Sequence, residues 1–435
     1  MKKTFRFLSM AALLVVGAIM TGCSSDDIID NPQQPTNKDN VVTLTATVGF
    51  EANAGTRAIN GTTGVKTFES TNQIAVIYKN TSNETVKAVS TDFTPTGDNT
   101  TATFTVSLTN PATDGAIRYI YPATMAKDVA TDATITNDAA TIDYSGLFGS
   151  QDGKLTTLGT NYDLAVFDGS LSGTALPASA TLTNPLTICK FTFKDTGSSD
   201  ITNITRLTVS DGTNAYGIST SGLSEIYVAM KPVASGNIAF TAATASKTYF
   251  RTVTGKSLAA SKLYTNITVG SMVELAKGNV IGYDGKIYAN KAGAEAVSTG
   301  NAAAVIVYLG SDTYDATYKN GLAIALADDE GLKSWSTAKS TCEGKTAITG
   351  AKWCLPSQDQ WKQMFKANGD DDASYTDLNT TINTAGGTTL PYDACYWSSS
   401  ESSPGNFYRV WLHGTASWHT GEEYYTYQVR ACLAF

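Results

Sequence analysis

Short runs of β-branched and aromatic residues, separated by Gly, Asn, Asp and Pro, fill the chain from residue 41 to about residue 270. Several runs alternate between apolar and polar positions, as in Thr187–Phe193, where Phe191 and Phe193 fall on one face of a strand. Because no amphipathic helical pattern lies between the runs, they predict antiparallel β-sandwich structure. The length of the region favours two small sandwiches that divide near residues 170–180. Examples of the predicted strands are Val41–Glu51, Gln73–Lys79, Ala102–Leu108, Ala116–Tyr121, Leu164–Phe167, Thr187–Phe193, Ile226–Met230 and Leu263–Val269.

From about residue 271 the pattern changes to mixed α and β. Continuous apolar runs at Ala304–Leu309 and Gly321–Leu326 predict strands that are buried on both faces. Ser357 and Gln360 form a capping box, which predicts the start of a helix. The other predicted elements are a hairpin at Val280–Tyr288, helices at Lys333–Cys342 and around Leu378 and Ile382, and final strands at Ala394–Ser398, Phe407–Leu412 and Tyr424–Phe435.

The chain begins with a basic segment, Met1–Arg6, and a mostly apolar run, Phe7–Met20, which is too short to span a bilayer and has the plan of a secretory signal. The run ends at Thr21-Gly22-Cys23, which resembles the bacterial lipobox, although Met20 stands where Leu is usual. This resemblance implies that residues 1–23 are a lipoprotein signal and that Cys23 carries acyl chains such as palmitate, which anchor the precursor in the outer membrane. The Ser/Asp run that follows is similar to the surface-export signals of Bacteroidetes lipoproteins. A plain secretory signal with an incidental cysteine is the alternative.

Composition narrows the class of function. The 435 residues are enough for about two or three domains. A net charge of -8 offers no surface to neutralise phosphates, so nucleic acid is not an expected partner. His413 and His419 are the only histidines, and no phosphate-binding loop, nucleophile elbow or His-Glu-x-x-His motif occurs. We therefore expect neither an enzyme nor a bound cofactor or metal.

The strand Val41–Glu51, followed by Gly55-Thr56-Arg57-Ala58 and a second strand at Gln73–Lys79, resembles the fimbrillin family of Bacteroidetes pilins. The resemblance implies a transthyretin-like β-sandwich within residues 58–270. It also implies that an Arg-specific protease cuts between Arg57 and Ala58, so that residues 24–57 are a tether and a removable first strand.

Removal of a first strand leaves an open sheet edge and an apolar groove, which a strand from another fimbrial subunit fills. A small-residue loop around Arg57 is accessible to a protease. The alternative is that Arg57 is a solvated loop arginine and that Val41–Glu51 stays in its sheet.

Four short motifs occur in the last part of the chain: Trp335-x-x-Ala338-x-x-x-Cys342, Trp353-Cys354-Leu355-Pro356-Ser357, Tyr396-Trp397-Ser398-Ser399 and Val429-Arg430-Ala431-Cys432. Together they resemble the C-type-lectin-like domain of the bacterial kind that is appended to fimbrillins, which implies an α+β lectin-like domain over residues 271–435. The resemblance also implies the disulfides Cys342–Cys432 and Cys354–Cys395. Four cysteines allow three connectivities, and reduced buried thiols are the alternative.

Calcium-dependent sugar lectins resemble one another through a Glu-Pro-Asn or Gln-Pro-Asp loop and a later Trp-Asn-Asp, and none of these triplets occurs here. The acidic runs at residues 328–330 and 370–372 offer oxygen ligands to calcium. We expect both runs to be solvated loops.

Aromatic and polar residues gather near the end of the chain, and all six tryptophans lie between Trp335 and Trp418. Aromatic rings beside polar groups can stack on sugar C–H faces or on peptide surfaces. Tryptophans that only fill the core of the domain are the alternative. The candidate ligand-binding residues are Trp411, His413, Trp418, His419, Tyr424 and Tyr425.

The sequence leaves three hypotheses of function. The first is a fimbrial tip adhesin at the cell surface, because we expect Val429–Phe435 to belong to the sheet of the last domain, with no spare tail to donate to another subunit. Its partners would be other fimbrial subunits, the maturation protease and a host or bacterial glycan or protein ligand. The alternative is a non-polymerising surface lipoprotein that binds glycan or protein ligands. An enzyme is a third, weaker class.

Overall fold

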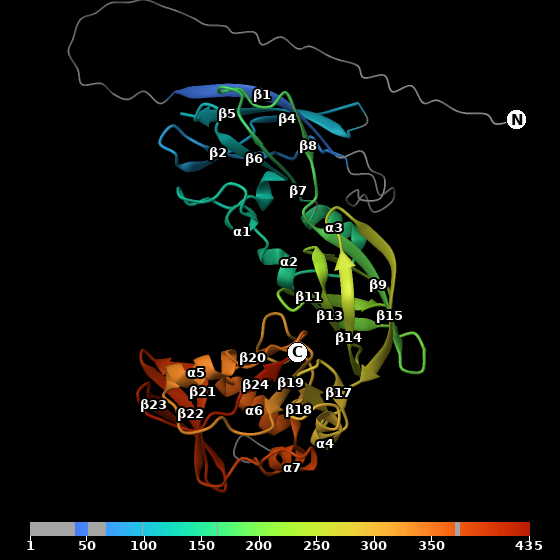
Figure 1. Ribbon diagram of the computed structural model, residues 1–435, viewed down its shortest axis with the longest axis vertical. Coiled ribbons are helices and arrows are strands. Elements are labelled where there is room, and N and C mark those ends of the chain that lie inside the picture. Colours follow the sequence, from blue (N-terminus) through green and yellow to red (C-terminus); the bar gives the residue numbers. More distant parts are fainter. Residues whose placement is uncertain (1–39, 51–66, 98, 163, 370–374) are drawn as a thin grey trace, which may run out of the picture. The chain divides into compact units, whose positions relative to one another are not determined.

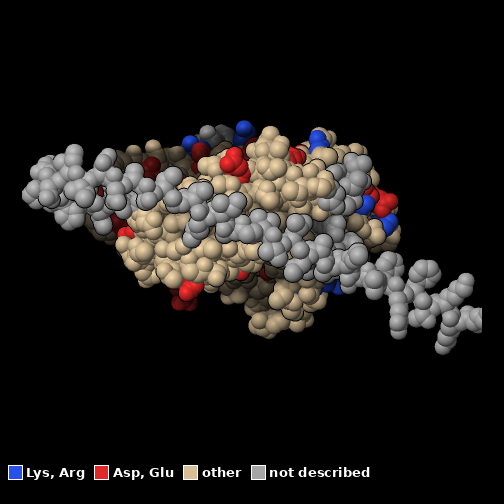
Figure 2. Space-filling view, turned by 90° about the horizontal axis from the view of Figure 1, so that it is seen from above, with Lys and Arg blue, Asp and Glu red and all other residues tan. Residues whose placement is uncertain are grey.

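The computed structural model describes residues 40–50, 67–97, 99–162, 164–369 and 375–435, and it is mainly β, as predicted (Figure 1). Cys23, Arg57, Ala58 and the acidic run 370–372 lie outside the described residues. Among the helices of the described part, none has the length and apolarity that a membrane span needs. Lysines and arginines visible on the described face of Figure 2 are scattered among other residues and form no patch there.

The first β region is a sandwich of two four-stranded sheets, with strand orders β4-β5-β1-β8 and β3-β2-β6-β7. In β5, Ala102, Phe104, Val106 and Leu108 alternate with hydroxyl residues, and all four are buried in the core between the sheets. The strands are β1 (Val41–Phe50), β2 (Ala75–Lys79), β3 (Thr85–Val89), β4 (Asp92–Thr96), β5 (Thr101–Thr109), β6 (Ala116–Tyr121), β7 (Ala165–Ser170) and β8 (Ser179–Leu182).

β1 lies inside its sheet and pairs with a strand on each side. It is antiparallel to β5, from Val41 opposite Thr109 to Gly49 opposite Thr101. Its last residues, from Thr47 to Phe50, run parallel to β8, and the residues before Thr47 have no register partner in β8. β5 and β8 are therefore neighbours of β1 but not of each other.

The connection from β6 to β7 forms η1 (Ala123–Met125), α1 (Asp138–Thr141), α2 (Ser145–Gly149) and α3 (Leu155–Asn161). Its buried residues Ile142, Leu147 and Leu158 share one hydrophobic core with the second β region. Arg118 of β6 is buried and forms ion pairs with Asp138 and Asp168, which neutralise its charge within the described structure.

The second β region is a seven-stranded sheet in the order β11-β10-β13-β14-β15-β9-β12. Phe191 and Phe193 share a buried face, as predicted, and both rings contact Phe240, with ring centroids 5.0 and 5.9 Å apart. The strands are β9 (Thr187–Asp195), β10 (Ile204–Ser210), β11 (Ala215–Leu223), β12 (Ile226–Met230), β13 (Val233–Ala243), β14 (Thr248–Leu258) and β15 (Leu263–Glu274).

The prediction of antiparallel pairing needs one correction, because β1 with β8 and β9 with β15 are parallel pairs. In each pair the two strands are far apart in sequence, and the chain between them forms other strands. Such long connections can return a strand in either direction, whereas a short hairpin enforces the antiparallel one.

The C-terminal region contains a six-stranded sheet, β17-β16-β18-β19-β24-β20, and a three-stranded sheet, β21-β22-β23. Its elements are β16 (Val280–Gly282), β17 (Ile287–Tyr288), α4 (Lys291–Glu295), β18 (Ala302–Leu309), β19 (Gly321–Ala325), α5 (Trp335–Glu343), β20 (Lys352–Cys354), α6 (Gln358–Ala367), α7 (Thr376–Thr384), β21 (Ala394–Ser403), β22 (Asn406–Leu412), β23 (Ala416–Glu422) and β24 (Cys432–Ala434).

The predicted capping box starts α6. The backbone N–H of Gln360 donates to the Ser357 hydroxyl at 3.1 Å, and the Ser357 N–H donates to the Gln360 side chain at 2.8 Å. Trp361, Met364 and Phe365 then form a buried stripe on this helix.

The last seven residues are buried, and three of them, Cys432–Ala434, form a strand of the six-stranded sheet. β24 lies between β19 and β20, and the Phe435 carbonyl accepts a hydrogen bond from the Asn320 N–H at 2.8 Å. The strand is shorter than the predicted Tyr424–Phe435, because only Cys432–Ala434 lie between two partner strands, and Tyr424 and Tyr425 are exposed.

Candidate functional site

The three-stranded sheet presents two different faces. Side chains that are paired in register across strands share a face, so Arg409 lies beside His419, and Trp411 lies beside Cys395 and Ser417. Residues of the opposite face, such as Val410 and Leu412, are buried in the core. The face that carries Trp411 is therefore the one available to a ligand.

Helix α5 covers one end of this face. The ring of Trp335 stacks on Phe407 with centroids 3.6 Å apart, and its indole N–H donates to the Ser398 carbonyl at 2.9 Å. Trp397 is fully buried, and its indole N–H donates to the Lys333 carbonyl. These tryptophans serve the core, as the alternative interpretation of the tryptophan cluster expects.

At the uncovered end, one carboxylate organises the exposed rings. Asp393 accepts a hydrogen bond from the indole N–H of Trp411 at 2.9 Å, and its oxygen lies 3.3 Å from Nδ1 of His413. The other nitrogen of His413 lies 3.1 Å from the Tyr392 hydroxyl. His413 is in ring contact with both Tyr392 and Trp411, at centroid distances of 4.7 and 5.1 Å.

The line of rings continues across the sheet. His419 lies edge-on to Trp411 at 5.8 Å and is the register partner of Arg409. The guanidinium of Arg409 lies 4.6 Å from the centre of the Tyr427 ring, and its Nη1 donates to the Cys395 sulfur at 3.0 Å. This cation–π contact connects the rings on the three-stranded sheet to Tyr427, which lies in the segment before β24.

Three tyrosines complete the line. Tyr425 lies 6.4 Å from Tyr427 and 4.8 Å from Tyr424, centroid to centroid. A hydrogen bond to the Glu422 side chain raises the pKa of Tyr424 to about 12, so its hydroxyl remains a neutral donor at physiological pH. We call the whole set the aromatic strip: Tyr392, Trp411, His413, His419, Arg409, Tyr427, Tyr425 and Tyr424.

Most of the aromatic strip is open to solvent, although Arg409, Trp411 and Tyr427 are half-buried. Tyr392 and Tyr424 are 64% and 66% exposed, and Tyr425 is 47% exposed. Large aromatic side chains in such positions have few contacts to stabilise the fold, which favours a role in binding.

The structure brings together five of the six predicted ligand-binding residues and separates the sixth. Trp418 pairs with Val410 on the opposite face and packs against the hydrophobic core. Its indole N–H is buried and has no hydrogen-bond partner among the described residues. Trp418 therefore belongs to the core side of the sheet, and the aromatic strip excludes it.

Four members of the site were missed by the sequence analysis. Arg409 stands two residues before Trp411, so the period of a strand could have placed it on the same face. Tyr427 could have been found by the same reasoning from Tyr425. Tyr392 and Asp393 precede β21, and no periodic pattern connects them to Trp411.

The acidic run at residues 328–330 is largely neutralised by cations. Asp328 lies 2.5 Å from the buried Arg430 and accepts a hydrogen bond from Tyr396 at 2.8 Å. Asp329 lies 2.6 Å from Lys345. In the described part of the chain, no group of three or more His, Cys, Asp or Glu residues could hold a metal ion.

Neither predicted disulfide is present: Cys342, Cys354, Cys395 and Cys432 are free thiols in this structure. The strand register places Cys354 of β20 directly opposite Cys432 of β24, whereas Cys395 lies beside Arg409. A hydrogen bond from the Cys432 thiol lowers the pKa of Cys354, and burial raises the pKa of Cys342. Cys354 and Cys432 are thus the pair that the fold brings together.

No protein-family model and no curated protein matches the chain. Among solved structures, a fimbrial protein from Bacteroides ovatus is similar over 92% of this chain and 100% of its own, at 15% identity and a TM-score of 0.31. A fimbrial assembly protein from Parabacteroides distasonis shares 7% identity over 54% of this chain and 93% of its own, with a TM-score of 0.29. The minor pilin GBS52 of Streptococcus agalactiae shares 10% identity over 54% of this chain and 97% of its own, with a TM-score of 0.24. Because these TM-scores are low, the proposals below rest on this chain's own residues.

The two faces of the sheet predict different effects of two matched substitutions. Trp418→Ala removes packing against the core and should lower the free energy of unfolding of the C-terminal region by about 2–4 kcal/mol. Trp411→Ala removes a ring from the exposed face and should cost about 1 kcal/mol or less. Urea unfolding followed by tryptophan fluorescence measures both, and equal losses would contradict the assignment of the faces.

Proposed function

We propose that the chain is a subunit of a cell-surface fimbrium that matures by loss of its first strand and binds its ligand through the aromatic strip. The observation that carries the proposal is the place of β1 between β5 and β8. Removal of an edge strand would shorten a sheet, but removal of β1 would divide this one.

The side chains of β1 show what the resulting groove would accept. Ala46 and Val48 are buried, and Phe50 stacks on Phe68 with ring centroids 4.0 Å apart. On the other face of the strand, Thr43 and Thr45 pair with hydroxyl groups of β5. The groove therefore fits a strand that alternates apolar and hydroxyl residues, which another subunit could supply by β-augmentation.

The proposed cut that opens this groove lies between β1 and β2 in the sequence, in a segment outside the described residues. Gly55-Thr56-Arg57-Ala58 offers one arginine to an Arg-specific protease. Cleavage after Arg57 would separate β1, together with a lipid-bearing Cys23, from the rest of the subunit. The lipid would hold the precursor at the outer membrane until then.

The burial of residues 429–435 supports the proposed position of this subunit in a filament. Val429–Phe435 are buried, and β24 pairs with β19 and β20. These residues are committed to their own sheet and cannot extend into a neighbour's groove without disrupting it. A subunit whose β1 groove accepts a strand, but whose residues 429–435 are not donated to a neighbour, suits the tip of a fimbrium.

The aromatic strip supplies the adhesive surface of the proposed tip. Its rings can stack on the C–H faces of sugars or on peptide side chains, and Arg409, Asp393 and the tyrosine hydroxyls supply hydrogen bonds. The same strip would serve a surface lipoprotein that does not polymerise, so the state of the peptide bond after Arg57 decides between the two functions.

Maturation predicts a defined N-terminus. Surface protein from cells with the unchanged chain should begin at Ala58, and both Arg57→Ala and Arg57→Lys should leave a precursor that begins at lipidated Cys23. Arg57→Lys keeps the charge and removes only the protease's preferred residue, so it separates cleavage from electrostatics. Mass spectrometry of surface material that still joins Thr56 to Ile59 in the unchanged chain would exclude strand removal.

Ligand binding predicts a loss that is specific to the aromatic strip. Trp411→Ala and Tyr425→Ala should each weaken binding about tenfold, which corresponds to roughly 1.4 kcal/mol per ring. Tyr314→Ala is the matched control, because Tyr314 is 58% exposed in the same region but lies outside the strip. Glycan and peptide arrays probed with and without a chelator measure the binding, and unchanged binding by both strip variants would exclude this surface.

A further inference from the structure

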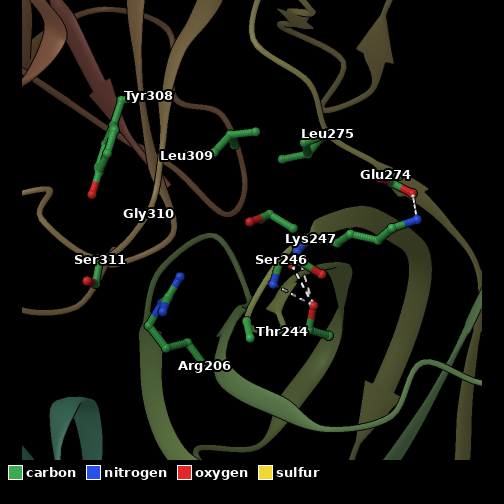
Figure 3. A pocket seen from close by; sticks show the side chains of 12 residues that line it. Arg206, Thr244, Ser246, Lys247, Glu274, Leu275, Tyr308, Leu309, Gly310 and Ser311 are labelled. Carbon is green, nitrogen blue, oxygen red and sulfur yellow. Dashed lines mark hydrogen bonds and ion pairs between the residues drawn. The ribbon is translucent and has the colours of Figure 1, made fainter. Parts of the chain in front are cut away.

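A pocket of about 300 Å³ lies apart from the aromatic strip, where the second β region meets the C-terminal region (Figure 3). One side is formed by β10, the turn from β13 to β14 and the end of β15, and the other side by the end of β18. Its lining includes the charged residues Arg206, Lys247 and Glu274, the hydroxyl of Tyr308, and Leu275 and Leu309.

Arg206 brings a positive charge to this pocket, and Asp312 acts on this charge at longer range without forming an ion pair. The Nε of Arg206 donates to the Lys319 carbonyl at 2.9 Å, and no carboxylate of the described residues forms an ion pair with it. The two buried arginines of the described residues are different, because Arg118 pairs with Asp168 and Arg430 pairs with Asp328. Burial lowers the pKa of Arg206, which indicates that the guanidinium is poorly solvated where it stands.

The other charges of the pocket cancel. Lys247 forms an ion pair with Glu274 at 2.7 Å, drawn at the right of Figure 3. The lining residues themselves therefore carry one net positive charge, from Arg206, and the carboxylate of Asp312 lies nearby but outside the lining. A guanidinium that keeps its Nη groups free can receive a carboxylate through two parallel hydrogen bonds.

The walls add neutral donors and apolar surface. The Tyr308 hydroxyl accepts a hydrogen bond from the Asp312 N–H at 3.0 Å, and burial raises the pKa of Tyr308, so the hydroxyl keeps its proton for donation. Leu275 and Leu309 provide the apolar part of the lining. A few polar groups on a partly apolar wall are typical of small-molecule sites, which often lie between domains.

The turn that forms one wall is held in place by its own hydrogen bonds. The Thr244 hydroxyl oxygen accepts from the backbone N–H groups of Ser246 and Lys247, at 3.4 and 3.1 Å. In Figure 3 these bonds appear as dashed lines that end at the side chain of Thr244. The wall is thus formed before a ligand arrives, which lowers the entropic cost of binding.

We propose that this pocket binds the carboxylate of a ligand of monosaccharide or amino-acid size, with Arg206 as its charged partner. The carboxylate pairs with the guanidinium, the Tyr308 hydroxyl donates to a further oxygen, and the leucines contact the carbon skeleton. The site is separate from the aromatic strip, so the protein would recognise an acidic small molecule in addition to the ligand of the strip.

The test uses the full chain and titration calorimetry with four small molecules. Galacturonate and N-acetylalanine carry the carboxylate on a sugar and on an amino acid, and galactose and N-acetylalanine amide are their neutral counterparts. We expect one carboxylate to bind in a 1:1 complex, with its neutral counterpart at least tenfold weaker. The better of the two carboxylates identifies the source of the ligand. Equal binding of charged and neutral forms, or no heat from either carboxylate, would overturn the proposal.

Variants of Arg206 locate the site. Arg206→Gln should weaken carboxylate binding at least tenfold. Arg206→Lys should weaken it less, because lysine keeps the positive charge but cannot donate two parallel hydrogen bonds as a guanidinium does. Arg251→Gln is the matched control: Arg251 lies in the same β region and donates to the Gly270 carbonyl, away from the pocket. Thermal unfolding of each variant checks the fold, and Arg206→Lys serves if Arg206→Gln is unstable. Unchanged binding by a folded Arg206 variant would overturn the assignment.

Discussion

The first sandwich depends on one strand, because β1 is the only element that joins β5 to β8 in the described part of their sheet. Its apolar side chains close the core that Phe104 and Leu108 share with the facing sheet. The same position makes β1 replaceable: a groove with two open edges and an apolar floor is an incomplete sheet, and a strand of matching pattern completes it. The contacts that β1 makes with β5, β8 and the core would thus stabilise the precursor, and the same contacts, made by a strand of another subunit, would hold the mature subunits together.

The C-terminal region separates the tasks of stability and recognition between the two faces of a small sheet. The face with Val410, Leu412 and Trp418 supports the core, and the buried Arg430–Asp328 ion pair ties β24 to the loop after β19. The face with Trp411 carries the aromatic strip, in which Asp393 holds the rings of Trp411 and His413 in place. Rings that are held in place before binding lose little entropy when a ligand arrives.

Much of this fold could be predicted from local patterns. Alternation gave β5 and the paired rings of Phe191 and Phe193, and the capping box at Ser357 gave α6, because these signals lie within a few neighbouring residues. β23 was missed because Ala416–Glu422 is largely polar and forms a strand only through its register with β22. The separation of Trp418 from Trp411, and the meeting of Cys354 with Cys432, likewise follow from register between strands, which no local pattern contains.

The most direct test of the account asks whether another strand can take the place of β1. The measurement is the thermal unfolding of a chain that begins at Ala58, alone and with a synthetic peptide of residues 41–50. The account predicts a lower melting temperature than that of the uncut chain, saturable recovery with the peptide, and no recovery with the Val48→Asp peptide, because Val48 is fully buried. A shortened chain that melts like the uncut one and ignores the peptide would contradict the account.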